Sequence, residues 1–127
     1  MHMPPKPTEA ELEILQILWQ KGSATVREVH DELAKSKDAG YTTTLKLMQI
    51  MAEKGLVTRN EDARTHVYTA AVTETETRQQ LLDKFIDTAF RGSAMKLVLQ
   101  ALGNHKTTPE ELEEIKRLLD SKGGAGS

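Results

Sequence analysis

Polar side chains that could bind nucleic acid share one spacing between positions 42 and 49. Thr42, Thr43, Lys46 and Gln49 recur at intervals of three and four, which places them on one side of a helix. A glutamine can hold adenine through two hydrogen bonds, and a lysine can reach guanine or a phosphate. Leu45 lies beside them, where its methyl groups could contact a thymine methyl. This side of the helix therefore suits the reading of base edges, although an ordinary solvated helix can carry the same residue types.

Three candidate phosphate contacts follow around a polar turn at residues 61–65. Arg59, Arg64 and His66 lie in or beside this turn, and such side chains commonly bind the DNA backbone. Thr25, at the predicted start of an earlier helix, could present free backbone amides to another phosphate. The alternative interpretation makes the two arginines ordinary surface charges.

Catalytic and metal-binding chemistry has little support in the sequence. There is no cysteine, which excludes disulfides, thiol nucleophiles and cysteine metal sites. The histidines at positions 2, 30, 66 and 105 share no ligand spacing, so we expect no metal site and no cofactor. A Gly-rich phosphate loop and the Gly-x-Ser-x-Gly elbow of hydrolases are both missing. We therefore expect that the protein is not an enzyme.

Helix starts are marked by one repeated pattern, a threonine followed three positions later by glutamate. In such a capping box the threonine hydroxyl accepts the amide of the glutamate, whose carboxylate accepts the amide of the threonine. The pattern begins at Thr8, Thr25, Thr73 and Thr108. It predicts four helices with well-defined first turns.

The elements of residues 7–71 follow the order helix, helix, helix, hairpin. Apolar periodicity predicts helices at about residues 8–21, 25–36 and 42–54, and alternating residues predict strands at 56–60 and 66–70. This order is that of a winged helix-turn-helix, in which the third helix enters the major groove and the hairpin contacts a neighbouring groove or phosphate. The buried side of the third helix should carry Thr44, Leu47, Met48 and Met51.

Residues 72–122 predict three more helices with wide apolar faces. About fifty residues make a poor independent core, so we expect these faces to pack against a second copy in a two-fold dimer. The alternative is that they fold back on the winged domain of a monomer. The predicted dimerisation residues are Leu82, Phe85, Ile86, Met95, Val98, Leu99, Leu102, Leu112, Ile115 and Leu119. The fold class is thus mainly α with a small β-hairpin, a winged helix-turn-helix plus a C-terminal helical dimerisation region, and residues 123–127 form a flexible tail.

Overall charge gives no support to DNA binding. The formal net charge of the 127 residues is -2, and neither residues 1–71 nor the rest carries an excess of cations. Any DNA interface must therefore depend on where the cations lie. A winged-helix module that binds proteins instead of DNA is the alternative that this acidity favours. With no apolar run of about 18 residues and no signal-peptide pattern, we expect a cytoplasmic protein.

Several segments, in this order and spacing, resemble the penicillinase-repressor family, the BlaI, MecI and CopY type, over roughly residues 7–121. The segments that carry the resemblance are Thr8–Leu15 with Trp19, Tyr41–Thr44, Glu53–Val57, His66–Tyr68, Phe90–Ser93, Leu97–Leu99 and Thr108–Leu112. The resemblance implies a dimeric repressor with an N-terminal winged domain, and it implies that Thr42, Thr43, Lys46 and Gln49 lie in the DNA-reading helix.

The same resemblance implies three partners: a double-stranded DNA operator, a second copy of the chain, and a membrane sensor and protease system. In that family, cleavage in the dimerisation region ends the repression of β-lactam-resistance genes, and the matching bond here is Gln100–Ala101. This chain differs from the family at two places. The candidate bond joins Gln100 to Ala101, whereas the family has a bond of Asn-Phe type. Ile50 stands where family members often carry a basic residue. The absence of cysteine excludes the metal hook of the CopY branch.

Overall fold

The computed structural model describes residues 5–62, 64–104 and 106–126 of the chain, with side chains up to Ser121. Contacts divide the chain into two compact units, with the boundary after Leu82. We call the part up to Leu82 the winged unit and the part from Asp83 the helical unit. The boundary lies within α4 (Glu74–Phe90), beyond the domain limit set after residue 71 from the sequence.

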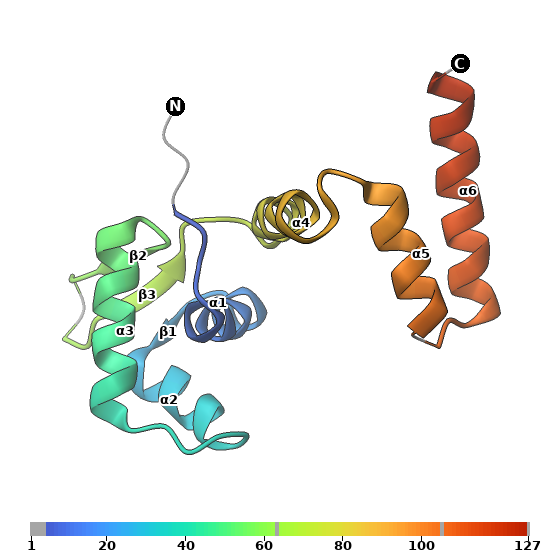
Figure 1. The fold of residues 1–127 in the computed structure, drawn as a ribbon. Coiled ribbons are helices and arrows are strands. Elements are labelled where there is room, and N and C mark those ends of the chain that lie inside the picture. The colour runs from blue at the N-terminus through green and yellow to red at the C-terminus, as the bar shows by residue number, and fades with distance from the viewer. Residues whose placement is uncertain (1–4, 63, 105, 127) are drawn as a thin grey trace. The chain divides into compact units, whose positions relative to one another are not determined.

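The winged unit has the predicted order of three helices and a hairpin, with one further short strand between the first two helices (Figure 1). Its elements are α1 (Glu9–Lys21), β1 (Ala24–Thr25), α2 (Val26–Ala34), α3 (Tyr41–Lys54), β2 (Val57–Asn60), β3 (Val67–Ala70) and the first turns of α4. The expected capping boxes at Thr8 and Thr25 are formed, with the amides of Glu11 and Glu28 each 3.2 Å from the threonine hydroxyl. Local sequence therefore defines where α1 and α2 begin.

The sheet has three strands, in the order β1-β3-β2, and all pairs are antiparallel. The sequence predicted only the hairpin of β2 and β3. The missing strand is β1, where Ala24 pairs with Tyr68 and Thr25 pairs with Val67. A strand of two residues is too short to show alternation, so only its pairing with β3 reveals it.

The core of the winged unit lies where α1, α2 and α3 meet the sheet. Thr44, Met48 and Met51 are buried and Leu47 is partly buried against the core, which confirms the inward side of α3. Trp19 of α1 donates its indole N–H to the carbonyl of Val72, at 2.9 Å. This hydrogen bond ties the segment after β3 to the first helix.

The helical unit contains the rest of α4, α5 (Ala94–Asn104) and α6 (Pro109–Gly126). Arg91 and Gly92, with φ of 51° and 85°, make the turn between α4 and α5. Helix α6 includes residues 123–126 of the segment expected as a tail, and Ser127 lies outside the described residues. In the described part of the chain, every helix is too short or too polar to cross a membrane.

Candidate nucleic-acid interface

The outward side of α3 carries the polar residues that the sequence singled out. Thr42, Thr43, Lys46 and Gln49 are exposed, and Leu45 is partly buried beside them. Helix α3 begins after Gly40, which has no side chain to bind the amides of the first turn. These amides can therefore donate hydrogen bonds to an outside partner such as a phosphate oxygen.

A hollow of about 340 Å³ joins α3 to α2 and to the hairpin. It is lined by Val26, Arg27, Tyr41, Leu45, Gln49, Arg59, Arg64, Thr65, His66 and Tyr68. The structure thus brings together five of the residues predicted from the sequence: Leu45, Gln49, Arg59, Arg64 and His66. The predicted residues Thr42, Thr43 and Lys46 lie on exposed α3 outside the lining.

Sequence reasoning missed Arg27 and Tyr41. The guanidinium carbon of Arg27 lies 5.1 Å from the centre of the Tyr41 ring, a cation–π contact between α2 and the start of α3. The ring of His30 contacts the ring of Tyr41 edge-on, with the two ring centres 5.6 Å apart. No spacing rule connects positions 27 and 41, because the contact exists only after α2 and α3 have packed.

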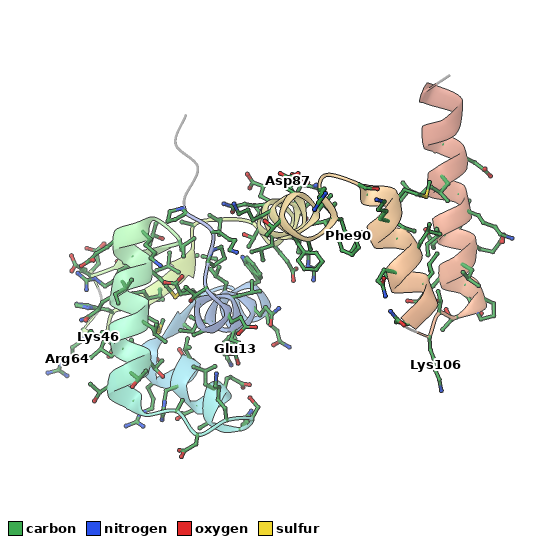
Figure 2. The ribbon with its side chains drawn as sticks, in the orientation of Figure 1. Glu13, Lys46, Arg64, Asp87, Phe90 and Lys106 are labelled. Carbon is green, nitrogen blue, oxygen red and sulfur yellow. The ribbon has the colours of Figure 1, made fainter. Side chains whose placement is uncertain are left out.

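Ion pairing distinguishes the cations of the winged unit from one another. Those within 4.0 Å of a carboxylate are Lys21, Lys35, Lys37, Lys54, Arg59 and Arg78. No ion pair is found for Lys6, Arg27, Lys46 or Arg64 among the described residues. Of these, Arg27 and Arg64 line the hollow and Lys46 lies on α3, so unpaired positive charge is concentrated there. Figure 2 shows Lys46 and Arg64 on the α3 and hairpin side of the unit, with Glu13 on α1.

Arg59 differs from Arg64 because protein groups already hold its side chain. It stands opposite Tyr68 in the pairing of β2 with β3, and its guanidinium forms an ion pair with Glu61 at 2.5 Å. A hydrogen bond with Tyr68 and the charge of Glu61 raise the pKa of Arg59 above its ordinary value. A phosphate bound by Arg59 would therefore compete with Glu61.

Thr25 is also engaged within the chain. Its hydroxyl accepts the amide of Glu28, and its own amide donates to the Glu28 carboxylate at 2.9 Å. These hydrogen bonds from Thr25 lower the pKa of Glu28, so this carboxylate stays negative at the start of α2. A phosphate at this helix start would meet that negative charge.

Comparisons with known proteins show the winged-helix fold in related structures and identify the family of this chain. The sequence profile described as penicillinase repressor matches residues 7–121. The chain belongs to the penicillinase repressor family. Among its relatives, the penicillinase repressor of Bacillus licheniformis is 26% identical over 116 residues, which cover 91% of each chain. The methicillin resistance regulatory protein MecI of Staphylococcus aureus (strain N315) is 26% identical over 115 residues, 91% of this chain and 94% of that protein.

Solved structures of BlaI, one of them of its DNA-binding domain alone, resemble part of this family member. The solution structure of the DNA-binding domain of the repressor BlaI matches with a TM-score of 0.52 and 28% identity, over 60% of this chain and 93% of that one. A second structure with the same values is monomeric BlaI of Bacillus licheniformis in complex with the blaP half-operator. The winged-helix fold and the resemblance predicted from the sequence are thereby confirmed. These two relatives are a repressor and a regulatory protein, in agreement with the expectation from the sequence of a chain without enzymatic activity.

The apolar side chains that were predicted to form the dimer are largely open to solvent in this family member. In α5, no described residue is buried. Ile86 and Ile115 are partly buried, whereas the other predicted dimerisation residues are 37–64% exposed. These exposed residues are Leu82, Phe85, Met95, Val98, Leu99, Leu102, Leu112 and Leu119. In the monomer, these apolar side chains are therefore not buried in a core.

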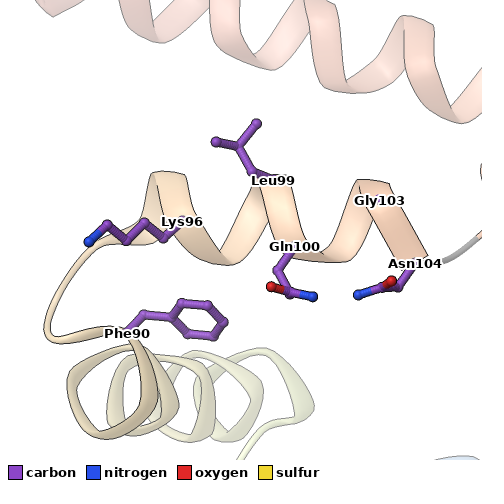
Figure 3. A pocket seen from close by; sticks show the side chains of 6 residues that line it. All are labelled: Phe90, Lys96, Leu99, Gln100, Gly103 and Asn104. Atoms are coloured by element: carbon purple, nitrogen blue, oxygen red, sulfur yellow. The ribbon is translucent and has the colours of Figure 1, made fainter.

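Gln100 and Ala101, the candidate cleavage residues, are exposed within α5. Gln100 lines an open hollow of about 410 Å³ together with Phe90, Lys96, Leu99, Gly103 and Asn104. Figure 3 shows the ring of Phe90 facing α5 on the side that carries Gln100 and Asn104. The bond thus lies on a helix beside an aromatic ring of the preceding one.

Within the described ranges, no three histidine or acidic side chains are placed to hold a metal. His30 contacts Tyr41, and His66 lines the α3 hollow. His2 and His105 lie outside the described residues.

Proposed function

We propose that the chain is a dimeric transcription repressor that binds a palindromic DNA operator through α3 and the β2–β3 hairpin, the wing. The observation that carries the proposal is the concentration of unpaired cations, Arg27, Lys46 and Arg64, on one side of a winged unit whose net charge is not positive. The other cations that the structure describes are mostly neutralised by carboxylates. The structure of BlaI with the blaP half-operator supports the same use of this fold.

In this proposal α3 enters the major groove with its outward side toward the bases. Gln49 hydrogen-bonds adenine, Lys46 binds guanine or a phosphate, and Leu45 contacts a thymine methyl. Thr42 and Thr43 bind a phosphate at the start of the helix, where Gly40 leaves amides free. On the wing, Arg59, Arg64 and His66 bind the backbone, and Thr25 approaches a further phosphate.

The apolar residues of α4, α5 and α6 pair with the same helices of a second copy. Burying them removes the exposed side chains of Phe85, Met95 and Leu99 from water, which is favourable in proportion to the apolar area. A two-fold dimer then presents two α3 helices to half-sites about one helical turn, or a multiple of it, apart.

Release of the operator by proteolysis is the part of the proposal that concerns Gln100 and Ala101. A membrane sensor and protease system, acting on this cytoplasmic repressor of β-lactam-resistance or related genes, would cut the bond between them. Because the bond lies inside α5, the helix must open locally before cleavage. Cleavage would separate the apolar face of α5 into two parts and weaken the dimer.

The test is binding of the full chain to DNA at increasing salt, followed by selection of bound sequences from a random duplex library. We expect the logarithm of the affinity to fall linearly with the logarithm of salt concentration, and the selected consensus to be palindromic. A chain that ignores duplex DNA in dilute buffer would contradict the proposal and favour a protein-interaction module. A consensus without symmetry would contradict the dimeric arrangement alone.

A further inference from the structure

We propose that Arg27, carried on the ring of Tyr41, is an additional phosphate-binding residue of the DNA interface; this inference rests on the proposed function. Arg27 belongs to α2, whereas the contacts assigned above, apart from Thr25, come from α3 and the wing. It lines the same hollow as Arg64 and His66. The positive side of the interface therefore continues from the wing across to α2.

Arg27 has the chemistry of an unoccupied anion-binding residue. Its side chain is exposed at the surface, and neither an ion pair nor a side-chain hydrogen bond is found for it within the described part of the chain. The cation–π contact with Tyr41 engages no hydrogen-bond acceptor, so the N–H donors of the guanidinium remain available. A phosphate of the DNA backbone can accept two of these donors at once.

Tyr41 acts as a positioning residue because its ring has a second contact with α2. His30 meets the ring edge-on, and the Nδ1 atom of His30 lies 3.5 Å from the hydroxyl of Thr44. Thr44 is buried, and its hydroxyl donates to the carbonyl of Gly40 at 3.3 Å. The platform for Arg27 is therefore fixed to the first turn of α3. A guanidinium held in this way loses less conformational freedom when it binds a phosphate.

The DNA backbone is the occupant that fits the surroundings. Arg27, Arg64 and His66 share the hollow with Gln49 and Leu45 of the base-reading side, so an anion bound by Arg27 borders the surface assigned to the bases. The carboxylate of Glu61 engages Arg59, and no carboxylate lines this hollow. An elongated polyanion that contacts α2, α3 and the wing together meets these conditions.

The experiment measures binding of the full chain to a fluorescent random-sequence duplex of about 30 base pairs, roughly three helical turns. Potassium chloride is varied from about 50 to about 200 mM, a range in which phosphate contacts strongly affect affinity. Arg27→Gln should weaken binding and reduce the salt slope by about one. Arg78→Gln is the matched control, because Arg78 is an exposed arginine of the same unit and is paired with Glu74. It should bind like wild type.

The role of the ring is tested in the same assay. Tyr41→Leu removes the platform but keeps the charge, so affinity should fall about two- to fivefold with the slope retained. Tyr41→Phe keeps the ring and should restore wild-type binding. Thermal unfolding of each variant checks that the fold is intact. Arg27→Lys keeps the positive charge, so it should retain the wild-type salt slope.

Two results separate the inference from the proposed function. If wild type binds DNA with salt dependence and Arg27→Gln keeps both its affinity and its slope, the Arg27 assignment is overturned and the proposed function stands. If wild type does not bind the duplex at all, the proposed function fails first. Equal weakening by Arg27→Gln and Arg78→Gln would also overturn the inference, because it would reflect net charge alone.

Discussion

At the scale of single residues, pairing decides which charges are available to DNA. The formal net charge of -2 argues against a polyanionic partner. The carboxylates of the winged unit nevertheless pair with cations such as Lys21, Lys37 and Lys54, which do not line the α3 hollow. Lys46, Arg64 and Arg27 keep their charge unpaired. The proposed interface is therefore defined by the absence of nearby carboxylates as much as by the basic residues themselves.

Replacing the residues that are proposed to read bases should affect specificity. Gln49→Ala or Lys46→Ala should cost about 1–3 kcal/mol in binding to the selected operator and relax the preferred base at the contacted position. Arg64→Ala should instead weaken binding to operator and random duplex alike and reduce the salt slope by about one. Titration of the operator and the random duplex by fluorescence anisotropy measures the effects of all these substitutions. Gln16→Ala, on exposed α1, is the control, and wild-type binding by all three interface variants would refute the groove assignment.

Glu61 should weaken DNA binding because it competes with phosphate for Arg59. Glu61→Gln removes the ion pair and one negative charge from the wing, so we expect tighter binding to every duplex and a steeper salt slope. Glu110→Gln on α6 makes the same change in net charge in the helical unit. An equal gain for both variants would show that only total charge matters.

At the scale of elements, α1 and α3 are joined through one buried carboxylate. Glu11 is 1% exposed, and it accepts the amide of Thr8 at 2.9 Å and the ammonium group of Lys54 at 2.8 Å. Burial alone would raise the pKa of Glu11, but the hydrogen bonds from Lys54 and Thr8 together outweigh it and lower the pKa. The start of α1 is thus fixed to the end of the proposed DNA-reading helix.

This arrangement predicts a specific loss of stability in acid. Because the folded pKa of Glu11 is lowered from 4.5, its contribution is complete above the unfolded pKa and is lost as pH falls through the folded value. Glu11→Gln should therefore destabilise the neutral protein by about 1–3 kcal/mol and flatten the decline below about pH 5. Urea unfolding at several pH values measures both effects. Glu9→Gln, exposed in the same turn, should keep the wild-type profile, and an unchanged Glu11→Gln profile would disprove the role of the carboxylate.

At the scale of the whole molecule, the two units differ in how they bury apolar side chains. The winged unit has a closed core around Ile14, Leu15 and Met48, all 0% exposed, whereas Met95 and Leu99 of the helical unit are 64% and 63% exposed. Large apolar side chains left in water favour association. The helical unit therefore has the properties expected of an assembly region, and the dimer remains a prediction.

Introducing charge into the apolar face should separate the subunits. Leu99→Asp places a carboxylate where the dimer would bury a methyl group, and an unpaired buried charge is strongly unfavourable. Sedimentation equilibrium should show a dimer for wild type and a monomer for the variant, with weaker binding to a two-half-site duplex. Lys116→Asp, on exposed α6, should stay dimeric. A mass unchanged by Leu99→Asp would contradict the proposed contact.

The sequence by itself determined the features that depend on near neighbours. The helices, the hairpin, the capping boxes at Thr8 and Thr25 and the inward side of α3 follow from spacings of two to four residues, since hydrogen bonds and amphipathic faces repeat at these distances. Tertiary structure decided the third strand, the contact of Arg27 with Tyr41 and the bond of Glu11 with Lys54. Each of these joins residues whose separation follows no period, so the contact exists only once the chain has packed.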